Sequence, residues 1–166
     1  MPRAPHLLLV LAPYYAHIAA MLRQGAERAL AAAGASYERF TVPGAFEIPA
    51  AIRYAVAAQA QGAREARFDG YVALGCVIRG ETTHYDYVCG ESARGLQDLA
   101  LEHSLAIGFG ILTVENEAQA LVRASVDGDK GGRDKGGEAT RACLALIELK
   151  RRFQGNTQGN ARGNAG

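Results

Sequence analysis

Two nearly continuous apolar runs constrain the fold of this chain more than any other feature. The runs Gly70–Ile78 (GYVALGCVI) and Leu105–Leu112 (LAIGFGIL) show no alternation between apolar and polar residues. Such runs are typical of parallel strands that helices cover on both faces. Two further short runs, Leu7–Leu11 and Tyr37–Val42, complete a set of four expected strands.

Helical periodicity fills the segments between and after these strands. Strands that alternate with helices form βαβ units with right-handed crossovers. We therefore expect an α/β fold with a parallel sheet, helices on both of its sides, and ligands bound beyond the carboxyl ends of the strands. The expected helices are Ile18–Ala33, Glu47–Ala60, Tyr85–His103, Glu115–Arg123 and Glu138–Phe153.

Charge and cysteine content exclude several classes of function. The 166 residues carry 18 Lys and Arg against 17 Asp and Glu, so nucleic acid and membranes are unsuitable partners. The three cysteines form no CxxC pair, which argues against a zinc site or a disulfide framework. The apolar run Leu7–Ala12 is too short for a signal peptide, and no run reaches the roughly 18 residues of a membrane span. We expect a cytoplasmic protein without a bound metal.

The carboxyl-terminal residues differ in composition from the rest of the chain. Residues 154–166 read QGNTQGNARGNAG and contain too few apolar side chains to form a packed structure. We therefore expect one α/β domain over residues 1–153 and a disordered Gly/Asn-rich tail over residues 154–166.

The segment from Cys76 to His84 (CVIRGETTH) carries the strongest chemical signal. A buried strand ends here, and a helix begins after Gly80, with Thr82 and Thr83 available as helix caps. Free N–H groups at a helix start, together with the helix dipole, form a site for anions. His84 is then placed to transfer protons near neutral pH. The alternative interpretation is a capped helix with an exposed histidine.

The segment Val42–Pro49 (VPGAFEIP) is a second candidate. Its prolines and glycine predict a rigid turn at a strand end that presents Phe46 and Glu47. The ring could stack on a planar ligand, and the carboxylate could accept hydrogen bonds from hydroxyls. Alternatively, the turn is only a helix entry. Tyr14 and Tyr15, which follow the first strand, either stack on a ligand or pack against the protein.

Four other positions have ordinary structural explanations. Phe109 lies inside an apolar strand, where a core position is expected, and Arg123 ends a short helix, where a surface position is expected. Lys130 and Lys135 lie in a repeated DKGG unit that resembles a phosphate-binding loop. The pattern GxxxxGK[ST] is absent, which excludes a P-loop.

Four separate segments, in the order in which they occur along the chain, resemble the 6,7-dimethyl-8-ribityllumazine synthase family of riboflavin biosynthesis. They are VPGAFEIP (42–49), GCVIRGETTHYDYV (75–88), ILTVENEAQA (111–120) and DKGGEA (134–139), and the resemblance spans residues 7–153. It implies a flavodoxin-like, three-layer α/β/α sandwich with a four-stranded parallel sheet. It also implies condensation of 5-amino-6-(D-ribitylamino)uracil with 3,4-dihydroxy-2-butanone 4-phosphate to give the lumazine, phosphate and water, with no cofactor.

The resemblance also implies roles for individual residues. His84 matches the proposed proton-transfer residue of the family, and Arg123 matches a residue that pairs with the substrate phosphate. Phe109 and Arg123 match positions that a neighbouring subunit contributes. The substrate-binding positions implied are Tyr14, Ala45, Phe46, Glu47, Cys76, Val77, Ile78, Glu81, Thr82, Phe109 and Lys135.

Two departures from the family pattern affect the expected oligomeric state and one expected ligand contact. Tyr14 replaces the usual phenylalanine, and the loop 124–137 is longer than in members that form spherical shells. We therefore expect a homo-oligomer with active sites at subunit interfaces and small-molecule substrates, a pentamer or a paired decamer rather than an icosahedral shell. Because the DKGG unit occurs twice, the sequence leaves open whether Lys130 or Lys135 is the lysine of the substrate-binding site. The main alternative function is a non-catalytic homologue that binds a flavin or a lumazine.

Overall fold

Four parallel strands form one sheet in the order β2-β1-β3-β4. The structure is a computed structural model that describes residues 3–62 and 68–163, with side chains up to residue 155. The strands are β1 (His6–Leu11), β2 (Ser36–Thr41), β3 (Gly70–Ile78) and β4 (Ile107–Val114). All three pairings between neighbouring strands are parallel, as predicted.

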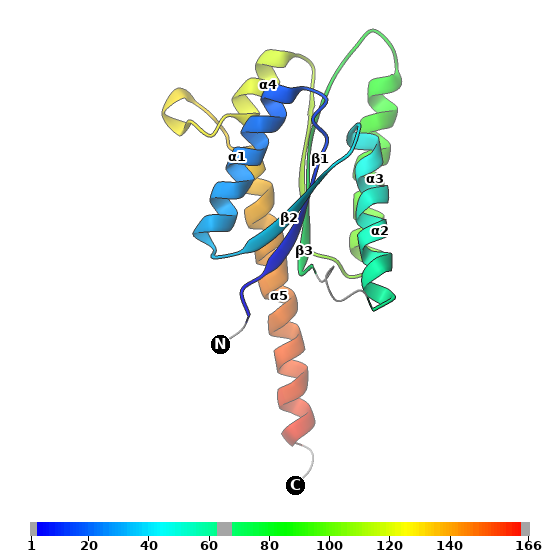
Figure 1. The fold of residues 1–166 in the computed structure, drawn as a ribbon, viewed down its shortest axis with the longest axis vertical. Helices are drawn as coiled ribbons and strands as arrows, with labels where there is room; N and C mark the ends of the chain where they lie inside the picture. The colour runs from blue at the N-terminus through cyan, green and yellow to red at the C-terminus, as the bar shows by residue number, and fades with distance from the viewer. Residues whose placement is uncertain (1–2, 63–67, 164–166) are drawn as a thin grey trace.

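Helices cover both faces of this sheet (Figure 1). One layer contains α1 (Ala16–Ala32), α4 (Glu117–Ala124) and α5 (Lys135–Gly163); the other contains α2 (Ile48–Ala60), which follows the short turn η1 (Ala45–Glu47), and α3 (His84–Glu102). The predicted three-layer α/β/α sandwich with a flavodoxin-like fold is confirmed. In the described residues, no helix combines the length and the apolar character needed to cross a membrane.

The alternation of side chains along β1 separates two apolar layers. Leu7 and Leu9 face α1 and α5, whereas Leu8 and Val10 face α2 and α3. All four side chains are buried, and burial of each contributes about 1.5–3 kcal/mol. β1 and most of β3 are thus covered on both faces, as the continuous apolar run in β3 predicted.

β4 differs from this expectation because it is an edge strand with one open face. Gly108 and Ile111 lie on opposite faces, and α5 lies so close to the first face that a Cβ on Gly108 would be 2.2 Å from the Ala139 carbonyl oxygen. Phe109 shares the second face with Ile111, yet its side chain remains 49% exposed. The expected core position for Phe109 is therefore wrong, because α3 does not cover the outer part of this edge.

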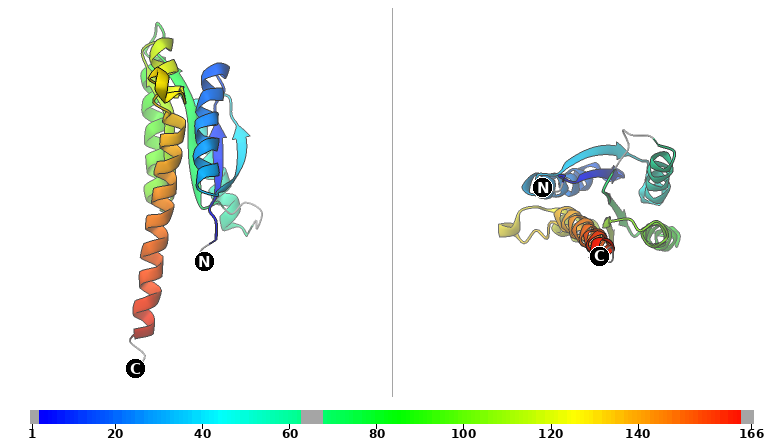
Figure 2. Two further views of the ribbon diagram at one scale, coloured as in Figure 1. Left: turned by 90° about the vertical axis from the view of Figure 1, so that its left-hand side faces the viewer. Right: turned by 90° about the horizontal axis from the view of Figure 1, so that it is seen from below.

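Helix α5 is longer than predicted. It begins at Lys135 instead of Glu138 and continues as helical backbone to Gly163. A helix that has already formed gains one hydrogen bond for each added residue, so a segment unable to nucleate a helix can still extend one. The predicted tail, residues 154–166, thus begins as a helix that projects past the sheet (Figure 2), and its residues 164–166 lie outside the described residues. Disorder of this segment in solution stays a prediction.

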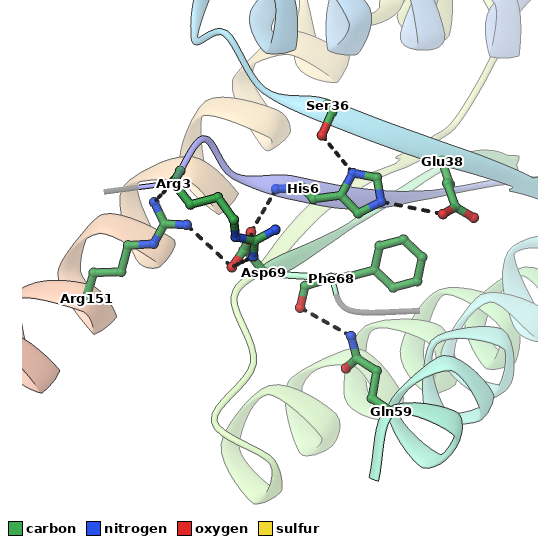
Figure 3. A network of polar contacts seen from close by, with 8 residues as sticks. All are labelled: Arg3, His6, Ser36, Glu38, Gln59, Phe68, Asp69 and Arg151. Atoms are coloured by element: carbon green, nitrogen blue, oxygen red, sulfur yellow. Dashed lines mark hydrogen bonds and ion pairs between the residues drawn. The ribbon is translucent and has the colours of Figure 1, made fainter. Parts of the chain in front are cut away.

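Asp69 joins three segments of the chain at the amino ends of the strands (Figure 3). Its two carboxylate oxygens each accept a hydrogen bond of 2.9 Å from Nη2 of Arg3, and Oδ2 also accepts one of 2.8 Å from the His6 backbone N–H. Nη2 of Arg151 on α5 lies 3.4 Å from Oδ1. The carboxylate, which directly precedes β3, therefore ties the first residues and α5 to the base of the sheet.

We predict that Asp69→Ala lowers the free energy of unfolding by about 1–3 kcal/mol, because it leaves a backbone N–H and two guanidinium groups without their acceptor. Urea denaturation measures this loss. Asp98→Ala is the matched control, since Asp98 pairs with Arg94 on an exposed helix face. Equal losses for the two variants would contradict the structural role of Asp69.

Candidate active site

A cavity of about 480 Å³ opens at the carboxyl ends of β1, β2 and β3. Its position follows from the strand order. The chain leaves β1 through α1 on one face of the sheet and reaches β3 through α2 on the opposite face. The neighbouring loops after β1 and β3 lead to helices on opposite faces, α1 and α3, and leave a crevice at this switch point, which is where ligands bind in open α/β sheets.

Most of the predicted binding residues line this cavity. They come from four separate segments that follow or end the three strands, so the fold brings together residues far apart in the sequence. The predicted residues that line it are Tyr14, Ala45, Phe46, Glu47, Cys76, Val77, Ile78, Thr82 and His84. Glu81 belongs to the same loop as Thr82 and His84, but its side chain is not part of the lining.

Aromatic rings dominate the accessible wall of the cavity. Tyr14 is 74% exposed and Phe46 is 55% exposed, and they lie after different strands. Tyr14 makes an edge contact with Tyr15 at a centroid distance of 5.0 Å. Exposed rings on two sides of a cavity can stack on a planar ligand without first breaking core contacts.

The remaining predicted residues, Phe109, Arg123 and Lys135, do not line the cavity. Phe109 lies on edge strand β4. Nη1 of Arg123 donates to the Gln119 carbonyl at 3.0 Å, and Nζ of Lys135 binds Glu138 Oε2 at 2.5 Å. The described lining thus contains no lysine or arginine side chain.

The loop between β3 and α3 contains backbone N–H groups without an acceptor among the described residues. Gly80 and Thr82 line the cavity, and the N–H groups of residues 80–83 have no acceptor in the part of the chain that the structure describes. Thr83 occupies the cap position of α3 without a side-chain cap, and the Thr82 hydroxyl accepts a 3.3 Å hydrogen bond from the His84 N–H. The predicted hydroxyl N-cap is therefore not formed: Thr82 precedes the cap position and makes only a short turn with the His84 N–H. The free donors leave the helix start able to bind an anion.

Sequence reasoning missed several lining residues on α3. Tyr85, Tyr87 and Val88 also line the cavity, together with Gly44 and Gly80. Tyr87 and Val88 follow His84 by three and four residues, the spacing that places side chains on one helix face. The helical spacing from His84 was therefore the signal that could have identified them.

Burial raises the pKa of the Cys76 thiol to about 11, and the nearby Cys89 adds to this effect. Burial also raises the pKa of Tyr15. Both groups are therefore neutral near pH 7, and Cys76 forms an uncharged part of the wall. Glu47 and His84 supply the carboxylate and the imidazole of the lining. No group of three or more potential metal ligands occurs among the described residues.

The fold is that of a flavodoxin-like α/β protein with a cavity at the carboxyl ends of its strands. Residues 4–151 match the family model described as 6,7-dimethyl-8-ribityllumazine synthase. The chain belongs to this family.

Named relatives cover nearly the whole chain. The 6,7-dimethyl-8-ribityllumazine synthase of Sphingopyxis alaskensis is 55% identical over 148 residues, which are 89% of this chain and 96% of that protein. The 6,7-dimethyl-8-ribityllumazine synthase 1 of Rhizobium meliloti is 54% identical over 89% of this chain and 93% of its own length. The 6,7-dimethyl-8-ribityllumazine synthase of Agrobacterium fabrum is 52% identical over 91% of this chain and 98% of its own length.

The environment of Cys76 predicts slow alkylation. At pH 8, a pKa of about 11 leaves about one thiol in 1,000 as thiolate, so iodoacetamide reacts at least about 100-fold more slowly than in urea. The rate rises with pH as the thiolate forms. Peptide mass spectrometry resolves Cys76 from the other two cysteines. Equal rates in the folded and the urea-unfolded protein at pH 8 would contradict the buried, neutral thiol.

Proposed function

We propose that this protein condenses 5-amino-6-(D-ribitylamino)uracil with 3,4-dihydroxy-2-butanone 4-phosphate to give 6,7-dimethyl-8-ribityllumazine, phosphate and water, the penultimate step of riboflavin biosynthesis. The observation that carries this proposal is the cavity itself. It joins exposed aromatic rings, a carboxylate, a histidine and a loop of free N–H groups at one switch point of the sheet. The names of the relatives support the same reaction.

The pyrimidine substrate fits the aromatic end of the cavity. The rings of Tyr14 and Phe46 stack on the planar pyrimidine, and residues 76–78 form the wall beside it. Glu47 accepts hydrogen bonds from the hydroxyls of the ribityl chain. These contacts all come from one protomer, and Phe109 is the substrate-binding residue that a neighbouring copy adds.

The phosphate of the second substrate fits the loop before α3. Backbone N–H groups of Glu81 and Thr82 and the amino end of α3 attract the dianion. No arginine or lysine of the described chain lines the cavity, so the balancing cation comes from elsewhere. Arg123 and Lys135 fill this role when a second copy brings α4 and the start of α5 to the cavity mouth.

The reaction requires several proton transfers, which His84 can relay. An amine of the pyrimidine attacks the ketone and gives a carbinolamine, which loses water to form an imine. Removal of a proton next to the imine expels phosphate and leaves an enol, which tautomerises to a ketone. The second amine attacks this ketone and closes the ring with loss of water. His84 accepts and returns these protons, and the N–H groups and Arg123 stabilise the departing phosphate. Both reactants are intrinsically reactive, so proximity supplies a large share of the rate.

We also infer a cytoplasmic homo-oligomer, a pentamer or a paired decamer, with active sites at the subunit interfaces. Phe109 on β4 and Leu121 and Val122 on α4 are exposed apolar side chains, which suits a surface that a neighbour covers. The long loop between α4 and α5 projects from the body (Figure 1), and this protrusion disfavours a closed icosahedral shell.

The first test is formation of fluorescent lumazine by the purified protein above the uncatalysed background. A non-catalytic binding homologue would leave that background unchanged.

His84→Ala lowers the single-turnover rate by up to about 100-fold but leaves measurable activity, because it removes the proton relay and retains proximity. His103→Ala, at the opposite end of α3, is the control with an unchanged rate. An unchanged rate in His84→Ala would remove His84 from the mechanism.

Arg123→Ala should raise the KM for the butanone phosphate more than the KM for the pyrimidine, because it removes a cation that faces the phosphate and not the pyrimidine.

Mixed assemblies test the interface directly. When equal amounts of the His84→Ala and Arg123→Ala proteins are unfolded together and reassembled, about a quarter of the sites regain both residues from different subunits. Recovery of activity toward that fraction is expected, whereas no recovery would indicate that both residues act within one protomer.

A further inference from the structure

One arginine links three structural elements at the rim of the cavity. Nε of Arg79, the residue after β3, donates a 2.7 Å hydrogen bond to Oε2 of Glu115, the residue after β4. Nη1 of Arg79 donates a 3.3 Å bond to Oδ1 of Asp86 in the first turn of α3. The guanidinium carbon lies 4.2 Å from the ring centroid of Tyr85, which follows His84. The Arg79 side chain therefore connects the end of β3 to the residue after β4 and to the first turn of α3, which contains His84.

These contacts join the two ends of the loop of residues 79–86, whose middle residues make few other contacts. At its start, the Arg79 N–H donates to the Val114 carbonyl at 3.0 Å, and at its end the Asp86 N–H donates to the Thr83 carbonyl at 3.0 Å. A Cβ placed on Gly80 would meet no atom within 4 Å, so no side chain packs against the loop at that point. The position of the loop relative to α3 therefore depends on the Arg79 side chain.

Glu115, the second anchor, is itself held in place. Its N–H donates to the Gln119 side-chain oxygen at 3.0 Å, and the Asn116 side chain caps α4 by accepting from the Gln119 N–H at 3.0 Å. Arg79 thus connects the loop to a preformed turn. The planar guanidinium can bind two carboxylates and lie over a ring simultaneously, which the single ammonium of lysine cannot reproduce.

We propose that Arg79 is a positioning residue that sets the orientation of His84. This inference rests on the proposed function. The three charged side chains are exposed at the surface, where ion pairs add little to global stability. The clamp therefore acts on local geometry, and its loss affects turnover far more than it affects unfolding.

The control is supplied by Arg94, which lies on the same helix as His84. Its Nη2 is 2.6 Å from Glu91 Oε2 and its Nη1 is 2.6 Å from Asp98 Oδ2, so it also forms two ion pairs. These pairs join residues within α3 and leave the cavity loop untouched. Arg94→Gln therefore removes contacts to two carboxylates, as Arg79→Gln does, without touching the loop.

The test compares kcat and both KM values for the full-length protein and five variants: Arg79→Gln, Arg79→Lys, Arg94→Gln, His84→Ala and the double variant Arg79→Gln/His84→Ala. We expect Arg79→Gln to lower kcat by about 10- to 100-fold, the size of effect that misplacement of a reacting group produces. The KM for the pyrimidine and the melting temperature change little. Arg79→Lys recovers only part of the rate, and Arg94→Gln matches the wild type.

The double variant shows whether Arg79 acts through His84. If it does, the double variant is about as slow as His84→Ala alone, because effects of residues that act as a unit are not additive. Losses that multiply would overturn the proposal, as would an Arg94→Gln variant that loses as much activity as Arg79→Gln.

Hydrogen exchange of the unliganded protein tests positioning independently of catalysis. Peptides that report the hydrogen-bonded amides at the start of α3, residues 84–88, should exchange faster in Arg79→Gln than in the wild type or Arg94→Gln. If the wild type forms no lumazine, the proposed function fails and this comparison still tests the clamp. Identical exchange in all three proteins would overturn the proposal whether or not the enzyme is active.

Discussion

The parallel pairing of β1 with β3 is the interaction on which the rest of the structure depends. Leu7 to Leu11 pair with Gly70 to Leu74, and both strands are buried between two layers of helices. This pairing places the loops that leave β1 and β3 side by side, and β2 adds the turn with Phe46 and Glu47 from the other side of β1. The cavity is therefore a consequence of strand order, and its chemistry comes from the residues at the strand ends.

The site separates two kinds of recognition. The aromatic and carboxylate groups that suit a pyrimidine with a polyol chain lie within one protomer. The cationic groups that suit a phosphate lie on α4 and at the start of α5, outside the lining of the same cavity. We propose that a second copy supplies the cations that the first lacks, which couples assembly to catalysis.

Periodicity predicted most of the fold, and the family resemblance predicted most of the cavity lining. Gly70–Ile78 has the predicted bounds because a central strand buried on both faces has a continuous apolar run. Phe46 and His84 could be located because loops after parallel strands lie at one edge of the sheet, whereas Ala45 and the binding role of Thr82 came from the resemblance.

Other features depend on tertiary contacts that no local pattern reveals. The exposure of Phe109 follows from the edge position of β4, and an apolar edge strand reads in sequence like a central one. The link from Arg79 to Glu115 joins residues 36 positions apart, and only the β3–β4 pairing brings them together. The extension of α5 past residue 153 contradicts its weak local helix propensity.

The most direct test of the central claim is a crystal structure of the assembled protein with a phosphonate analogue of the butanone phosphate. The account predicts that the phosphonate binds the backbone N–H groups of Glu81 and Thr82, with Arg123 of the partner subunit against its other side. An empty crevice at the ends of β1 and β3, or a phosphonate held only by residues of one protomer, would contradict it.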